Sequence, residues 1–298
     1  MGRVEAFGSV RSCGVTTLVL GLAATWPRRA EPPGRRVLVV EADPAGGTLA
    51  ALAGWPAEPG LVSLAAAARR GAEPSLVFEH CQHLPGGAAV LAGPARGDQA
   101  RSALVMLAPL LGRLDELDAD VLVDCGRLED SSAVLGIFER AAQSNRQSST
   151  VLVSRGRLAD LQAVASWLDA HPAGPRAGLV IVGDGPYPDA EVTEALGLSV
   201  LGRMPWDPGT PEALVACSAS DRRLRMAPLA RAARTLAEHL VRDALSGSEV
   251  MQDAVLAEQP RARRPVAVGH RVLSAWQADT RPHTNGHADG EVPGEAAR

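Results

Sequence analysis

Short apolar runs alternate with longer stretches of helical periodicity from the start of the chain to about residue 245. The runs are rich in Val and Leu, which is typical of strands buried on both faces of a parallel sheet. We expect strands at residues 4–10, 36–40, 88–92, 121–123, 150–154, 178–182 and 199–203. We expect helices at residues 16–26, 46–54, 61–70, 99–117, 131–143, 158–170, 189–196 and 229–245. Because strands that alternate with helices form βαβ units, the sequence predicts an α/β fold with a doubly wound, mostly parallel sheet.

The periodicity ends near residue 245, where the composition shifts to Pro, Gly, His, Asp and Arg. We therefore assign residues 1–245 to one domain and residues 246–298 to a C-terminal tail that we expect to be disordered. The last predicted helix is amphipathic, and we expect its apolar side, with Leu229 and Leu236, to pack on the sheet. Residues 261–276 of the tail combine basic residues with one Trp and represent either a linker or a short docking peptide.

Composition narrows the classes of function. Aromatic residues make up only 3% of the 298 residues, so the core has to be built from Ala, Val and Leu. The net charge of −4 argues against a globally basic nucleic-acid binder. All 30 basic residues are Arg. This excludes chemistry that depends on a lysine, such as a Schiff base or the phosphate-binding lysine of a complete P-loop.

The cysteines and the hydropathy favour a cytoplasmic protein. The four cysteines are far apart and form no C-x-x-C pair, so neither a zinc site nor a disulfide framework is indicated. Reduced thiols are the rule in the cytosol. The sequence shows no secretory signal pattern, and no apolar run approaches the length of about 18 residues that a membrane span needs.

Chemistry-bearing residues stand at three predicted strand ends, which is where open α/β sheets bind their ligands. The first segment, residues 8–17, reads G-S-V-R-S-C-G-V-T-T. A loop that leads into a helix N-terminus turns backbone N–H groups toward a bound phosphate. Against the complete P-loop motif G-x-x-x-x-G-K-[ST], Gly14 and Thr16 match, whereas Val15 stands at the lysine position. A plain strand-to-helix turn is the alternative interpretation.

The other two strand ends carry carboxylates. Glu41 and Asp43 follow a buried run, and Asp124 ends the run at residues 121–123. Carboxylates at such places hold Mg²⁺ through water or orient an attacking water molecule. A solvated strand end with an Asp-Pro turn is the alternative at Asp43. An apolar strand that ends in Asp, as at Asp124, is typical of a Walker B position.

In this order, the three segments resemble the MinD/ParA group of deviant Walker-motif ATPases. The family loop K-G-G-x-G-K-T-T is similar to residues 10–17, its D-x-D-P-x-G motif to residues 41–46, and its D-x-P-P-like switch to residues 124–127. Residues 191–208, EVTEALGLSVLGRMPWDP, resemble the family segment ALG-x-P-V-L-G-x-I-P-x-D-P, which flanks the nucleotide base. The likeness spans about residues 3–242 and implies a P-loop NTPase-like three-layer sandwich.

The chain is also similar to a lysine-less, actinobacterial-type subset of this family with loops like G-S-P-G-V-T-T. A further likeness is to the TadZ/CpaE branch, which is tied to pilus and secretion ATPases. These finer resemblances rest on fewer residues than the family resemblance does.

The resemblance implies ATP and Mg²⁺ as ligands. Thr16 and Asp124 would hold Mg²⁺, Thr17 would contact the α-phosphate, and Gly14 would let the backbone approach the phosphates. Asp43 would position the attacking water and is the expected catalytic residue, with Glu41 as its companion acid. The remaining expected nucleotide-binding residues are Arg11, Ser12, Cys13, Val15, Pro205 and Asp207.

Both lysines of the family loop are missing here, because Val10 and Val15 stand in their places. Losing one charge-assisted contact in a phosphoryl-transfer site costs about 10²–10³-fold in rate. Arg11 and Arg127 are the candidates for supplying the lost charge. Asp184 is either a turn residue or a reader of a guanine edge, and Cys13 is either a small buried residue or a redox-sensitive thiol.

The resemblance leaves two functions open. The first is a weak or inactive ATPase, a pseudo-ATPase, that acts as an adaptor in positioning, chromosome partitioning, or secretion and pilus assembly. The second is a slow Mg-ATP-hydrolysing partitioning ATPase that dimerises on ATP, with Arg replacing the lost lysines. The implied partners are a secretion or pilus ATPase, or a polar or partition factor, with a homodimer as a further state. The family also implies peripheral contact with a membrane or with the DNA of the nucleoid, although no sequence feature supports either.

Overall fold

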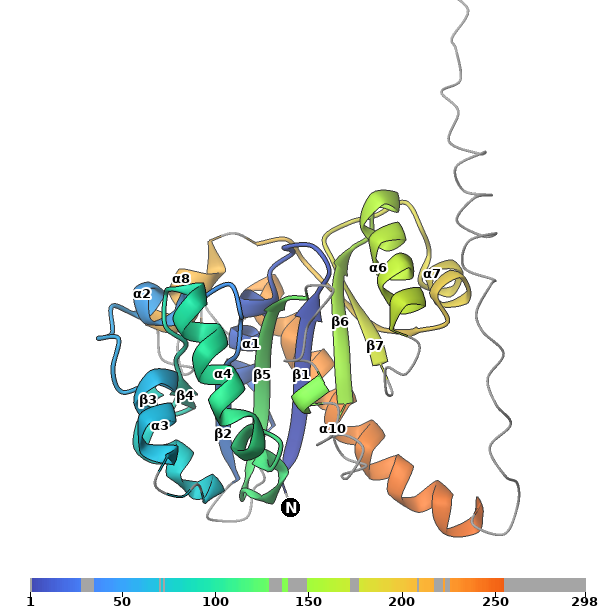
Figure 1. The fold of residues 1–298 in the computed structure, drawn as a ribbon. Coiled ribbons are helices and arrows are strands. Elements are labelled where there is room, and N and C mark those ends of the chain that lie inside the picture. Colours follow the sequence, from blue (N-terminus) through green and yellow to red (C-terminus); the bar gives the residue numbers. More distant parts are fainter. Residues whose placement is uncertain are drawn as a thin grey trace, which may run out of the picture.

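The computed structural model describes residues 2–27, 35–69, 71, 73–128, 136–138, 149–171, 177–207, 209–216, 222 and 226–254, with side chains placed up to residue 242. Within this part of the chain, one 8-stranded sheet runs through the molecule and helices cover both of its faces (Figure 1). The predicted α/β fold with a doubly wound, mostly parallel sheet and three layers is confirmed.

The chain places β1 (Arg3–Ser9) inside the sheet, between β5 (Ala119–Arg127) and β6 (Ser149–Arg155). The other strands are β2 (Arg36–Glu41), β3 (Gln82–His83), β4 (Ala89–Leu91), β7 (Ala177–Val182) and β8 (Ser199–Met204). The strand order is β3-β4-β2-β5-β1-β6-β7-β8, and only the pair β3–β4 is antiparallel. The parallel strands therefore end at one edge, at the top in Figure 1, where the three sequence segments meet.

Each face of the sheet carries its own apolar layer. Strand residues alternate between the two layers, so that Leu38 and Val40 of β2 face one cluster while Val37 and Val39 face the other. One layer is covered by α3 (Leu61–Ala68), α4 (Gly97–Leu111), α6 (Leu158–Ala170) and α7 (Asp189–Leu196). The other is covered by α1 (Val15–Thr25), α2 (Leu49–Ala53), α8 (Thr210–Ala216) and α10 (Pro228–Ala254).

Several element bounds differ from the predictions. Helix α2 begins only at Leu49, not at residue 46, because the turn with Gly46 at φ 115° precedes it. Helix α4 ends at Leu111 and is followed by the 3₁₀ turn η2 (Leu114–Glu116) instead of continuing to residue 117. The turn η1 (Pro74–His80), β3 and α8 have no counterpart among the predicted elements. The predicted helix at residues 131–143 lies largely outside the described residues.

The last helix confirms the predicted docking on the sheet and extends it. Leu229 and Leu236 are buried in the layer shared with α1. The helix runs past residue 245 to Ala254, so the expected helix end is too early. Residues 248–254 contain Glu, Val, Met, Gln and Ala but no Pro, and these helix formers outweigh Gly247. The rest of the tail, residues 255–298, lies outside the described residues. None of the helices in the described segments combines the length and apolarity that crossing a bilayer requires.

Candidate functional site

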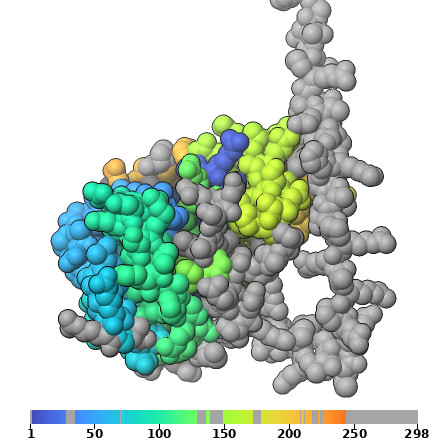
Figure 2. Space-filling view, in the orientation of Figure 1, coloured from blue at the N-terminus to red at the C-terminus, as the bar shows by residue number. Residues whose placement is uncertain are grey.

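The loop after β1 leads into α1, and we call it the phosphate loop after the motif that it resembles. Gly14 precedes the helix with φ 96°, a left-handed conformation that favours glycine. The first N–H groups of α1 have no partner within the helix and make its start a site for anions. Arg11 and Ser12 are exposed on this loop. The loop reaches the surface as the deep blue atoms at the top of the molecule (Figure 2).

Cys13 ties the loop to the neighbouring strand. Its thiol is buried and donates a hydrogen bond to the carbonyl oxygen of Val153 in β6, at 3.1 Å. Burial raises the pKa of the Cys13 thiol to about 11, against the opposing effects of Ser9 and Arg155. A thiol with this pKa stays protonated at neutral pH, so the geometry supports the small buried residue and not the redox-sensitive one.

Val15 occupies the lysine position of the P-loop motif, and its side chain belongs to the core. It is 5% exposed and packs in the same apolar layer as Leu18 and Leu22 of α1. Val10, at the other lysine position, is half-buried and packs against the opposite layer. Both positions have therefore become packing positions, and neither supplies a charge to the loop.

Thr16 and Asp124 come together as expected for a Mg²⁺ site. Asp124 is 1% exposed, and its Oδ1 accepts the Gly126 N–H at 2.9 Å, whereas its Oδ2 accepts no hydrogen bond of ordinary geometry. The Thr16 hydroxyl lies close enough to favour the charged form of this carboxyl. Burial, with smaller contributions from Glu41 and Asp43, nevertheless raises the pKa of Asp124 to about 7.

An unpartnered buried carboxylate oxygen beside a threonine hydroxyl is a donor set that suits Mg²⁺. The described residues hold no cluster of three or more His, Cys, Asp or Glu side chains arranged around a metal position. An ion here would therefore take most of its ligands from phosphate and water, which is the usual situation of Mg²⁺ at nucleotide sites.

Glu41 has a structural role that the sequence reasoning missed. Its Oε1 accepts the N–H groups of Thr48 at 2.6 Å and Leu49 at 2.9 Å, and its Oε2 accepts that of Gly93 at 2.9 Å. Burial raises the pKa of Glu41, opposed by these three hydrogen bonds. A Cβ at Gly47 would lie 2.4 Å from Oε2, so the turn approaches this carboxylate closely. The expected companion acid thus holds the loop in shape through both of its oxygens.

Asp43, the expected catalytic residue, joins the second and third segments. It is half-buried, and its Oδ1 accepts the Ala45 N–H at 2.7 Å. Its side chain lies against Gly126, where a Cβ would come within 2.0 Å of Asp43 Cγ. Arg101 of α4 donates to the carbonyl oxygen of Pro44 at 3.0 Å and holds the same loop from the other side. Asp43 therefore stands next to the Asp124 segment at the edge of the sheet.

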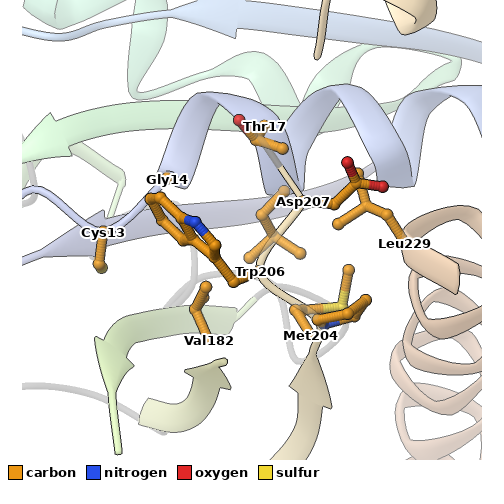
Figure 3. A pocket seen from close by; sticks show the side chains of 10 residues that line it. Cys13, Gly14, Thr17, Val182, Met204, Trp206, Asp207 and Leu229 are labelled. Carbon is orange, nitrogen blue, oxygen red and sulfur yellow. The ribbon is translucent and has the colours of Figure 1, made fainter. Parts of the chain in front are cut away.

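A cavity of about 220 Å³ opens beside the start of α1 (Figure 3). Its lining brings together the phosphate loop, the ends of β7 and β8, and the first turn of α10. The residues are Cys13, Gly14, Thr17, Leu18, Val182, Met204, Pro205, Trp206, Asp207 and Leu229. Most of these side chains are apolar, which suits a flat ring better than a charged group.

The expected base-flanking residues Pro205 and Asp207 do line this cavity, but the Asp207 carboxylate is hydrogen-bonded to the residues at the start of α8. Its Oδ1 accepts the N–H groups of Gly209 and Thr210, each at 3.2 Å, and its Oδ2 accepts the Thr210 hydroxyl. It therefore holds the beginning of α8. Trp206, between them, is 57% exposed and was not singled out by the sequence reasoning. Its place between Pro and Asp in the segment that resembles the base loop was the available signal.

The predicted residues thus separate into groups. Five line the cavity: Cys13, Gly14, Thr17, Pro205 and Asp207. Thr16 faces Asp124 deeper in the sheet edge, and Val15 lies in the core. Arg11, Ser12 and Arg127 are exposed at the same edge. Asp184 is exposed and does not line the cavity.

Neither a protein-family model nor a curated protein matches the sequence. Solved structures do match the fold. A ParA family ATPase from Chlorobium tepidum TLS superposes with a TM-score of 0.63 at 16% identity, over 80% of this chain and 100% of its own. The septum site-determining protein MinD from Pyrococcus horikoshii OT3, complexed with Mg-ADP, gives 0.60 at 20% identity, over 84% and 99%. The MinC:MinD cell division complex of Aquifex aeolicus gives 0.58 at 11% identity, over 89% and 99%. This chain therefore has the α/β fold of the ParA and MinD P-loop ATPases.

Proposed function

We propose that this protein is a positioning or assembly factor that binds Mg-ATP weakly and hydrolyses it slowly or not at all. The proposal depends on two neighbouring residues at the start of α1. Val15 is buried in the core, whereas the hydroxyl of Thr16 faces the buried carboxyl of Asp124. Val15 therefore offers no cation to a bound phosphate, whereas Thr16 and Asp124 still provide the oxygen ligands that we propose for Mg²⁺.

Binding and hydrolysis depend on these two places differently. Backbone N–H groups at a helix start, together with Mg²⁺, neutralise phosphate charge in the ground state. Phosphoryl transfer also requires stabilisation of the charge that develops on the transferred group. Removing one such contact lowers the rate by about 10²–10³-fold. We therefore expect nucleotide binding with impaired turnover, which makes the protein a pseudo-ATPase.

A protein that binds nucleotide without rapid turnover acts through what it contacts. The similar structures include one with a partner, in which MinD is complexed with MinC. By analogy, we propose that this chain binds a protein partner: a polar or partition factor, or the ATPase of a secretion or pilus system. A homodimer and a cytoplasmic location, peripheral to membrane or nucleoid, belong to the same proposal.

A second candidate function is a slow but genuine ATPase whose arginines replace the lysines across a dimer. Arg11 and Arg127 favour it, because both are exposed at the edge of the sheet that carries the phosphate loop. On this proposal, their guanidinium groups extend from this edge toward the nucleotide of a second copy. On this reading Arg11→Ala or Arg127→Ala lowers phosphate release, and Asp43→Ala abolishes it. Unchanged release in Asp43→Ala removes Asp43 from the chemistry.

Titration calorimetry tests the first proposal. Mg-ATP, Mg-ADP and Mg-GTP are titrated into the wild type and into Thr16→Ala, with phosphate release followed in parallel. We expect wild-type binding in the micromolar range or weaker, a clear loss in Thr16→Ala, and release close to background. Thr235→Ala, an exposed position of α10 that does not line the cavity, is the matched control and keeps its affinity. The proposal fails if the wild type binds no nucleotide, or if Thr16→Ala binds as the wild type does.

A further inference from the structure

Trp206 stands out among the exposed side chains. Of the large apolar side chains that are exposed in the described residues, it alone is aromatic. It follows β8 and lies beside the phosphate loop, where it lines the cavity with Cys13 and Gly14 (Figure 3). An exposed tryptophan beside an apolar cavity offers a flat surface to a ligand.

A guanidinium group holds this ring. The Cζ atom of Arg155, at the end of β6, lies 4.8 Å from the centroid of the Trp206 ring. A cation over one face of an indole is attracted to the ring and favours this orientation of it. Arg155 also lies near the phosphate loop, because it favours the charged form of the Cys13 thiol. The end of β6 thus contacts the ring, and Arg155 itself is not part of the cavity lining.

Apart from Thr17, on the wall toward the start of α1, the Cys13 and Asp207 side chains of the cavity are hydrogen-bonded to the protein itself. The Asp207 carboxylate holds the start of α8, and the Cys13 thiol donates to Val153. The lining at the ends of β7 and β8 is formed by Val182 and Met204. A ligand group in this cavity is therefore held by stacking and apolar packing, and side-chain hydrogen bonds contribute little.

The size of the cavity limits what enters it. At about 220 Å³, it is smaller than the range of about 300–1,000 Å³ that is usual for pockets enclosing a whole small ligand. It accepts a ring system and leaves a charged remainder outside. Gly14 and Thr17 form its wall toward the start of α1, so this remainder would extend toward the phosphate loop.

We propose that Trp206, held by Arg155, is the stacking surface for the base of the nucleotide, and that it binds adenine and guanine with similar strength. This rests on the proposed function and adds a specificity residue to it. Stacking of a base on an aromatic side chain tolerates different bases, because every base has a π-face. Its loss on substitution by alanine typically corresponds to about 5–150-fold in affinity.

Four ligands distinguish binding of the base from binding of the phosphates: Mg-ATP, Mg-GTP, adenosine and Mg-tripolyphosphate. Each is titrated into the wild type, Trp206→Ala, Trp206→Phe and Arg155→Ala, by calorimetry and by tryptophan fluorescence. Trp55→Phe is the spectral control, because Trp55 is half-buried and does not line the cavity. Circular dichroism checks the fold of each variant, which we expect to be kept because Trp206 is largely exposed.

We expect Trp206→Ala to weaken both nucleotides at least about fivefold and to leave Mg-tripolyphosphate unchanged. Trp206→Phe keeps most of the affinity, Arg155→Ala loses part of it, and the two nucleotides bind the wild type within tenfold of each other. The base should quench the fluorescence of the wild type and of Trp55→Phe, but not that of Trp206→Ala.

Two results overturn the stacking role while the proposed function stands. In the first, Trp206→Ala and the wild type bind Mg-ATP with equal affinity. In the second, Trp206→Ala loses as much affinity for Mg-tripolyphosphate as it loses for Mg-ATP. A preference of more than tenfold between Mg-ATP and Mg-GTP overturns the lack of base selectivity. Binding of adenosine without any binding of Mg-ATP or Mg-tripolyphosphate supports the stacking surface and overturns the proposed function. A wild type that binds none of the four ligands overturns both.

Discussion

Glu41 and Asp124 are cross-strand neighbours in β2 and β5, but their carboxyl groups are bonded very differently. Both oxygens of Glu41 accept backbone N–H groups, whereas Oδ2 of Asp124 accepts none. Each carboxylate disfavours ionisation of a neighbour in a buried site, which contributes to the raised pKa of Asp124. The Glu41 carboxylate holds the loop before α2 in shape, whereas Oδ2 of Asp124 is available as a ligand for an ion. The following predictions test this division of roles.

Glu41→Gln should lower the free energy of unfolding by about 1–3 kcal/mol. The amide oxygen can still accept the Thr48 and Leu49 N–H groups, but the amide nitrogen then faces the Gly93 N–H and leaves a buried donor unpaired. Urea unfolding measures the change, with Glu79→Gln on the exposed surface as the control. Equal stability of the two variants would show that the Glu41 hydrogen bonds do not hold the loop.

Val15→Ala should cost about 1–3 kcal/mol of stability, because two buried methyl groups leave a cavity in the layer between α1 and the sheet. The exposed neighbour Ser12→Ala is the control and should stay within about 0.5 kcal/mol of the wild type. Thermal unfolding measures both variants. A Val15→Ala protein as stable as the wild type would mean that this side chain is not part of the core.

Gly126→Ala should be more destabilising than Gly54→Ala. Both glycines have a positive φ, 60° and 66°, so both substitutions carry a conformational cost of about 1 kcal/mol. Only at Gly126 does the new Cβ meet Asp43, whereas at Gly54 nothing lies within 4 Å. The difference between the two unfolding free energies therefore measures the packing of Asp43 against the Asp124 segment. No difference would contradict that contact.

Stability should fall as the pH rises from about 4.5 to about 8, with Glu5 as a cause. Glu5 lies in β1, 3.6 Å from Arg3, and is hydrogen-bonded by Ser149. Burial, the largest effect, raises its pKa from 4.5 to about 8 despite these two partners. The folded state then binds one more proton than the unfolded state in this window, so the unfolding free energy falls by about 1.4 kcal/mol per pH unit.

Above pH 8 Glu5 is ionised in both the folded and the unfolded state, so it no longer makes the unfolding free energy depend on pH. Glu5→Gln should remove the slope that Glu5 causes, while the slope from Asp124, with a pKa of about 7, remains. Urea unfolding at pH 5, 6, 7 and 8 measures both proteins. Parallel curves for wild type and Glu5→Gln would show that Glu5 does not titrate in this range.

Much of the fold follows from the pattern of the chain. Apolar runs such as the one around Val39 are buried on both faces, and each becomes a parallel strand. The short strand β3 was missed because its two residues are too few to show a pattern. Helix α8 was missed because its seven residues pack against α1 and α2, which lie far earlier in the chain. Local periodicity carries no signal for such contacts.

The site was predictable in its positions and less so in its roles. Gly14, Thr16, Asp43 and Asp124 meet at one edge because parallel strands end there. That Glu41 is bonded through both oxygens depends on Gly93, which no local pattern connects to it. The burial of Val15 likewise depends on how α1 is rotated on the sheet, which the sequence of the loop alone does not determine.

A single-turnover experiment separates ATP binding by this protein from ATP hydrolysis. Labelled Mg-ATP is mixed with excess protein, and bound ATP and released phosphate are followed over time, beside a ParA-type ATPase that has both lysines. We expect ATP to be bound and to remain intact for at least about 100-fold longer than in the reference protein. Hydrolysis at the rate of the reference protein, or no retention of ATP at all, would contradict this expectation.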